Sequence, residues 1–227
     1  MAIATINPAT GETEAEFAAH TDAEIEAKIQ QSHDAFAAMK ATSFAQRGAW
    51  MNAAADLLEA EVETAARMLT TEMGKTIVQA RGEVLKSAKN LRFYAEKAEE
   101  FMTGRELPAA AVGASRAYTT YEPIGAILAV MPWNYPLWQV IRFAAPALMA
   151  GNTVLLKHAS NVPQSALYLE SIFLRGGFPA GSFNTLLIGA AKVEGVLRDR
   201  RVVAATLTGS EPAGRSVAAI AGSEVKP

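Results

Sequence analysis

Cysteine is missing from all 227 residues of this chain. A disulfide framework, a thiolate zinc site and a cysteine nucleophile within these residues are therefore excluded. Charge is modest too, because charged residues make up 19% of the chain and the formal net charge is −2. Neither nucleic acid nor an anionic membrane is expected as a partner, since both are bound by strongly basic surfaces.

The chain also lacks long apolar runs. The longest strongly apolar run, at 124–131, is far too short to span a bilayer. The first residues lack the basic start and the long apolar stretch of a signal peptide. We therefore expect a soluble, cytoplasmic protein, with a packed core because 50% of its residues are hydrophobic.

The first hundred residues divide into a turn-rich opening and a helical zone. Residues 7–11, Asn-Pro-Ala-Thr-Gly, predict a turn between two short extended stretches. From 22 to 102 the chain is rich in good helix formers, and its apolar residues recur at helical spacing. We predict three helices there, the last over 76–101, with Gly74 ending the helix before it.

The second half changes to an alternation of strands and helices. Residues 115–122 are polar and prone to form a strand, which suits an exposed or edge strand. Short apolar runs follow, and each precedes a segment that can form a helix. The runs are 124–131, 153–156, 183–188 and 202–207, and the helical segments are 137–149, 163–175, 191–198 and 211–221. This alternation predicts an α/β fold with a parallel sheet covered on both faces.

In such a sheet, ligands bind at the carboxyl ends of the strands, which here precede four loops, at 132–136, 157–161, 189–191 and 208–214. The loop at 132–136 places Trp133 and Asn134 there, between two prolines. The Asn134 amide could donate to a developing oxyanion, and Trp133 could wall a pocket. The alternative is a turn around a buried tryptophan.

The next loops offer features suited to a phosphate. Lys157 closes an apolar strand and could reach a ribose or a phosphate, with Ser160 nearby. The alternative is a solvated lysine followed by a serine that caps a helix. At 208–214, Gly209 and Gly214 permit close approach of a phosphate to a helix N-terminus. This spacing is neither a dinucleotide fingerprint nor a Walker loop, and a plain strand-to-helix turn fits almost as well.

Arg142 lies within an otherwise apolar segment. Its guanidinium could bind a substrate carboxylate through two hydrogen bonds, or it could extend its charged end into water. The histidines at 20, 33 and 158 are scattered, so no metal site is expected.

Taken together and in order, these motifs resemble the aldehyde dehydrogenase superfamily, and within it the NADP-dependent succinate-semialdehyde dehydrogenases. The matching motifs are Asn-Pro-Ala-Thr-Gly-Glu at 7–12, Glu-Met-Gly-Lys at 72–75, Pro-Trp-Asn at 132–134, Gly-Phe-Pro-Ala-Gly at 177–181 and Leu-Thr-Gly-Ser at 207–210. The resemblance implies a Rossmann-like cofactor domain over 124–227. A turn-rich and helical region at 1–114 and an edge or oligomerisation strand at 115–123 would precede it.

The resemblance also implies site residues and a cofactor. The cofactor contacts would be Trp133, Asn134, Lys157, His158, Ala159, Ser160, Gly209 and Ser210. Asn134 would also donate to the oxyanion, and Arg142 would bind the substrate carboxylate. NADP is expected rather than NAD, because NAD-preferring members usually have a glutamate at the position of Ser160, and that glutamate would repel a 2′-phosphate. His158 replaces a more usual proline, and we expect it to contribute only its backbone.

Two catalytic groups of the family are missing from these residues. The family uses a cysteine thiolate as nucleophile and a glutamate, in a Glu-Leu-Gly-Gly motif expected just after residue 227, to activate water. We therefore expect a truncated chain that is inactive alone, with a small aldehyde as the substrate of the full-length enzyme. A homo-oligomer, or a complementing C-terminal chain that completes a split enzyme of this or another aldehyde specificity, remains open. So does a non-catalytic nucleotide-binding protein.

Overall fold

The computed structural model describes residues 2–227 and begins with a hairpin followed by a helical layer. Strands β1 (Ile3–Ile6) and β2 (Thr13–Phe17) pair antiparallel around the expected turn. The helices that follow are α1 (Asp22–Ala41), α2 (Phe44–Ala60), α3 (Val62–Met73) and α4 (Ile77–Phe101).

The prediction of three helices in this zone was wrong, because the structure has four. The break between α2 and α3 is the single residue Glu61, whose ψ of 17° departs from the helical value. The Glu61 N–H still donates to the Leu57 carbonyl, and its carbonyl still accepts from the Ala65 N–H. The apolar spacing therefore continues across the break, and the sequence pattern does not reveal it.

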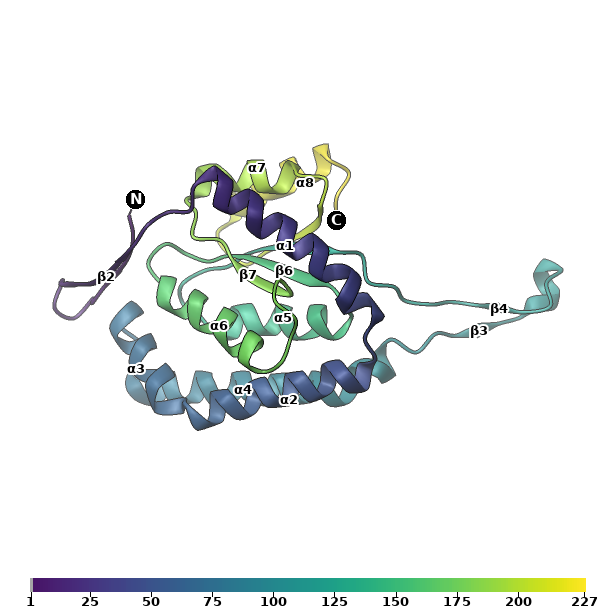
Figure 1. Ribbon diagram of the computed structural model, residues 1–227, viewed down its shortest axis with the longest axis horizontal. Coiled ribbons are helices and arrows are strands. Elements are labelled where there is room, and N and C mark those ends of the chain that lie inside the picture. Colours follow the sequence, from purple (N-terminus) through teal and green to yellow (C-terminus); the bar gives the residue numbers. More distant parts are fainter. Residues whose placement is uncertain (1) are drawn as a thin grey trace.

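Residues 103–122 form an arm that extends away from the body of the molecule (Figure 1). It contains β3 (Glu106–Leu107), the short 3₁₀ helix η1 (Ala109–Val112) and β4 (Ala117–Tyr118), with β3 and β4 antiparallel. The predicted strand over 115–122 was therefore too long, because only its residues 117 and 118 pair. A two-stranded ribbon with no other strand beside it is marginally stable, which limits the ladder to two residues.

The prediction of a parallel α/β sheet is confirmed. Strands β5 (Ala126–Val130), β6 (Thr153–Lys157), β7 (Phe183–Thr185) and β8 (Val202–Leu207) are parallel, in the order β7-β6-β5-β8. The connecting elements are α5 (Trp138–Met149), α6 (Pro163–Arg175), the 3₁₀ helix η2 (Ala190–Lys192) with α7 (Val193–Arg198), and finally α8 (Glu211–Ser223). Every residue of β6 is buried, which explains the apolar run at 154–156 in its centre.

Helices cover both faces of the sheet (Figure 1). Helices α1, α7 and α8 lie on one face and α5 and α6 on the other, and α2, α3 and α4 pack outside α5 and α6. The helical zone thus forms an outer layer behind two of the helices that follow the sheet strands. Within residues 2–227, no helix has both the length and the apolar character needed to cross a membrane.

Two glycines fix close approaches between segments that are distant in sequence. Gly74 ends α3 with φ +79°, as expected, and a Cβ there would lie 2.9 Å from the Pro8 ring. Gly181 has φ +91°, and a Cβ there would lie 2.5 Å from the carbonyl oxygen of Gln31 in α1. The first contact seats the N-terminal turn on the α3–α4 junction, and the second seats α1 against the segment before β7.

Candidate functional site

Three of the four expected loops begin side by side at the carboxyl ends of their strands, which we call the sheet edge. Strand β5 lies between β6 and β8, and the ladders extend one residue past each strand. The Met131 N–H donates to the Lys157 carbonyl (3.1 Å), and the Thr208 N–H donates to the Val130 carbonyl (3.1 Å). The strand order therefore brings together the loops at 132–136, 157–161 and 208–214.

The loop at 132–136 exposes the side chains that sequence analysis selected. Trp133 is 50% exposed and Asn134 is also exposed, whereas Pro136 is buried. The alternative of a buried tryptophan was therefore wrong. Both side chains are available to a ligand at the sheet edge.

The imidazole of His158 ties this loop to the next one. Its Nε2 donates to the Pro136 carbonyl (2.9 Å), and its Nδ1 accepts from the Ala159 N–H (2.9 Å). This arrangement requires the neutral tautomer. Burial lowers the pKa of His158 to about 4, so the ring is neutral at pH 7. From the sequence we expected only backbone contributions from His158, and the buried contacts of its side chain were not predicted.

A carboxylate from the outer helical layer holds the start of α5. Oε1 of Glu83, in α4, accepts from the backbone N–H groups of Leu137 (2.9 Å) and Trp138 (3.0 Å). Lys75 forms a buried ion pair with Glu83. The Lys75 ammonium also lies 3.6 Å from the centroid of the Tyr135 ring, so the same lysine contacts the loop directly.

A second carboxylate holds the start of α6. Glu72, at the end of α3, accepts from the backbone N–H groups of Gln164 (2.6 Å) and Ser165 (2.9 Å). It also accepts from the hydroxyls of Ser165 (2.5 Å) and Thr5 (3.1 Å). Burial raises the pKa of Glu72, and these hydrogen bonds oppose the rise. Ser160 does not cap this helix, because the residue at the cap position is Val162.

Helix α8 begins differently. Its own Ser210 caps it by accepting from the Ala213 N–H (3.4 Å), and Gly209 and Ser210 are exposed. Among α5, α6 and α8, only α8 begins without a buried carboxylate from another element. Its first turn carries the exposed Glu211, which pairs with Arg215 (2.6 Å), so the N–H groups at the start of α8 remain accessible to an anion.

Lys157 lines a pocket of about 310 Å³ between the sheet edge, α7 and α8. The residue is only 9% exposed, so the alternative of a solvated lysine was wrong. Burial lowers the pKa of Lys157, and within residues 2–227 no carboxylate forms an ion pair with its ammonium. Glu194 also lines the pocket, but its carboxylate pairs with Arg198 (2.8 Å) rather than with Lys157.

The walls of this pocket are mostly apolar and were not singled out from the sequence. They include Val130, Ala190, Val193, Leu207, Val217 and Ile220. The fourth expected loop, at 189–191, contributes Ala190 and Ala191. The sequence could have indicated them as pocket walls, because they lie in or beside the predicted strand-end loops and helices.

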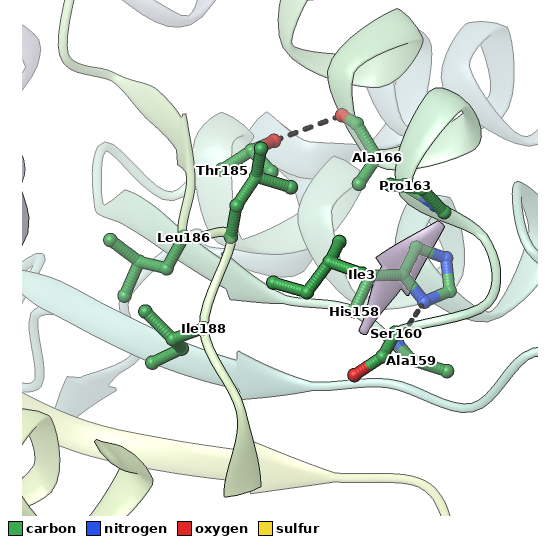
Figure 2. A pocket seen from close by; sticks show the side chains of 10 residues that line it. Ile3, His158, Ala159, Ser160, Pro163, Ala166, Thr185, Leu186 and Ile188 are labelled. Carbon is green, nitrogen blue, oxygen red and sulfur yellow. Dashed lines mark hydrogen bonds between the residues drawn. The ribbon is translucent and has the colours of Figure 1, made fainter. Parts of the chain in front are cut away.

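Ser160 and Ala159 line a different and much smaller pocket, together with His158 (Figure 2). Ile3 of β1 lies at the same pocket, and the Ala4 N–H donates to the Ser160 carbonyl (3.1 Å). The N-terminal strand therefore supports the 157–161 loop from behind. Lys157 and Ser160 share a loop but line different pockets.

Arg142 is exposed on α5 and donates to the Thr208 hydroxyl (3.2 Å). Its partner is a hydroxyl of the 208–214 loop, and its charged end stays near the solvent. The guanidinium remains available to a carboxylate. In the described part of the chain, no group of three or more His, Cys, Asp or Glu side chains is placed to hold a metal ion.

Comparison with known proteins identifies the family to which this chain belongs. The model of the aldehyde dehydrogenase family matches residues 1–227. A "Succinate-semialdehyde dehydrogenase [NADP(+)] 1" of Mycobacterium tuberculosis is 63% identical over 100% of this chain and 50% of its own length. The corresponding protein of Mycobacterium leprae is 60% identical, also over 100% of this chain and 50% of its own length.

A solved structure has the same fold. It is a succinic semialdehyde dehydrogenase from Streptococcus pyogenes, in complex with NADP+. It superposes with a TM-score of 0.93 and 36% identity, over 98% of this chain and 49% of that one. The chain thus spans about half the length of the proteins it matches.

Proposed function

Because this chain belongs to the aldehyde dehydrogenase family, we propose that it binds NADP+ at the sheet edge, as part of an enzyme that oxidises succinate semialdehyde to succinate. The observation that carries the proposal is the convergence of the three loops around two positive features. These features are the Lys157 ammonium and the N-terminus of α8.

The residues present fit a dinucleotide in chemistry. The apolar walls of the 310 Å³ pocket suit the flat face of an adenine ring. Gly209 and Ser210, at the open end of α8, suit the pyrophosphate. Trp133 and Asn134 would then face the nicotinamide end. Backbone groups of His158 and Ala159 would complete the adenosine side.

The preference for NADP rests on the 157–161 loop. Lys157 supplies a positive charge, and Ser160 supplies a neutral hydroxyl where a carboxylate would repel a 2′-phosphate. The named relatives from mycobacteria are NADP-dependent, which supports the same choice.

Bound NADP+ would supply the acceptor for a hydride from the aldehyde carbon. This chain would supply the Asn134 amide as a donor to the oxyanion and the Arg142 guanidinium as a partner for the substrate carboxylate. It has no cysteine. We therefore propose that the nucleophile and the general base come from polypeptide outside these 227 residues, in the same or a complementing chain, and that these residues alone are inactive. The arm, including 115–123, would serve contacts between copies.

Intrinsic tryptophan fluorescence tests the binding proposal, because Trp133 lies at the site. Titration with NADP+ should change the emission at lower concentrations than titration with NAD+, and the change should be much smaller in Trp133→Phe. NADPH absorbance with succinate semialdehyde should stay flat for the chain alone. It should rise once a chain carrying the second half of a relative is added. Binding without turnover in the folded mixture would favour a non-catalytic nucleotide-binding protein instead.

A further inference from the structure

Two helices at the site begin on apolar residues that cannot cap them. Leu137 precedes α5 and Val162 precedes α6, and neither makes a side-chain cap bond. The free N–H groups of both helices are instead bonded by carboxylates of the outer helical layer. Glu83 bonds α5 across 54 and 55 positions of sequence, and Glu72 bonds α6 across 92 and 93.

Both carboxylates are almost completely buried. Glu72 is 2% exposed and Glu83 is 3% exposed. A buried carboxylate needs hydrogen bonds or a counter-charge. Glu83 is satisfied by the N–H groups of α5 together with the Lys75 ammonium, and Glu72 by the N–H groups of α6 together with two hydroxyls. Water cannot replace the missing caps at these positions.

Each helix directly follows one binding loop. The first residue of α5 comes two positions after Pro136, which ends the loop with Trp133 and Asn134. The first residue of α6 comes two positions after Asn161, which ends the loop with Lys157 and Ser160. Fixing the first turn of a helix therefore fixes the point at which the preceding loop must end.

We propose that Glu83 and Glu72 are positioning residues for cofactor binding, each setting the place of one loop at the sheet edge. The proposal rests on the proposed function. The two residues divide the task, because their loops face different parts of the dinucleotide. The Glu83 loop faces groups common to NAD+ and NADP+, and the Glu72 loop faces the 2′-phosphate that only NADP+ has.

Replacing each carboxylate should therefore change the affinities for NADP+ and NAD+ in a different way. In Glu83→Gln the dissociation constants of NADP+ and NAD+ should rise together, by about tenfold, with their ratio unchanged. In Glu72→Gln the dissociation constant of NADP+ should rise by about tenfold and that of NAD+ much less, so the preference falls. Glu63→Gln, which removes an exposed carboxylate paired with Arg81, is the matched control and should change neither.

Milder variants test the same contacts if Glu83→Gln or Glu72→Gln does not fold. Lys75→Arg retains the counter-charge of Glu83 and should bind like the wild type, whereas the double variant Lys75→Met, Glu83→Gln leaves no unpaired buried charge and should show the Glu83→Gln pattern. Ser165→Ala removes one of the hydrogen bonds to Glu72 and should show a smaller form of the Glu72→Gln pattern. Circular dichroism confirms that each variant is folded.

Acrylamide quenching of Trp133 separates this proposal from the proposed function, because it needs no cofactor. Quenching should increase in Glu83→Gln but not in Glu72→Gln, and the increase should vanish when Trp133→Phe is added. If the wild type binds neither dinucleotide while quenching follows this pattern, the proposed function fails and the positioning of the 132–136 loop stands. Identical quenching in folded wild type and Glu83→Gln, or equal effects of both variants on the NADP+/NAD+ ratio, would overturn the proposal.

Discussion

Acidic pH should lower the unfolding free energy of this protein, because one buried imidazole resists protonation. His158 is 5% exposed, and its neutral form both donates to the Pro136 carbonyl and accepts from the Ala159 N–H. Protonation would place a charge on a buried ring and would end the bond from the Ala159 N–H, a loss that the Met131 carbonyl, 3.3 Å from Nδ1, offsets only in part. The folded state therefore resists protonation of His158, whereas the unfolded chain does not.

The size of the effect follows from the two pKa values. The pKa of His158 is about 4 in the folded state against an ordinary 6.5. Because the folded value is the lower one, the stabilisation is fully present above pH 6.5 and is lost as the pH falls toward 4. Proton linkage gives a loss of about 2 kcal/mol between pH 7 and pH 5, and about 3 kcal/mol in total.

Urea unfolding at pH 7, 6 and 5 measures this loss. The comparison is with His158→Gln, whose amide can donate and accept but does not titrate. Other ionisable groups contribute equally to both proteins, so the difference in unfolding free energy should shrink by about 2 kcal/mol from pH 7 to pH 5. Parallel pH profiles for the two proteins would refute the assignment of a buried, neutral His158.

Three further changes should have distinct outcomes. Ser160→Glu should shift the preference from NADP+ toward NAD+, because a carboxylate repels the 2′-phosphate; equal affinities before and after, measured by calorimetry, would remove the electrostatic argument. The affinity for NADP+ should be highest below the lowered pKa of Lys157 and should fall as the pH rises through that pKa. An affinity that stays constant up to about pH 10, and is the same in Lys157→Met, would contradict a role of the Lys157 ammonium in binding. Gly181→Ala should lower the unfolding free energy measured in urea by about 2–4 kcal/mol, because its Cβ would lie 2.5 Å from the Gln31 carbonyl oxygen. Gly195→Ala, whose Cβ would meet nothing within 4 Å, is the control. Equal stabilities of the two variants would show that small shifts relieve the close approach at Gly181.

The sheet was predictable because buried parallel strands have continuous apolar sequences. Helix α6 was predicted with the bounds it has, 163–175, and in the structure a proline opens it and Gly176 follows it. The site edge followed from the rule that ligands bind at strand ends. The residues named there do lie on three adjacent loops, although their contacts with a cofactor remain predictions.

What the sequence did not reveal depends on contacts between distant segments. Glu72 and Glu83 lie on helices that carried no obvious chemistry, and the helix N–H groups that they accept from are 54 to 93 positions away. Lys157 and His158 are polar residues at the end of a strand, where exposure is expected, yet packing buries both. The break at Glu61 was invisible because the apolar spacing runs through it.

Calorimetric titration of these 227 residues with NADP+ tests the central claim most directly. We predict one site per chain, tighter binding of NADP+ than of NAD+, and a loss of that preference in Lys157→Met. No heat of binding from folded protein, or a preference that survives the loss of the lysine, would contradict the account.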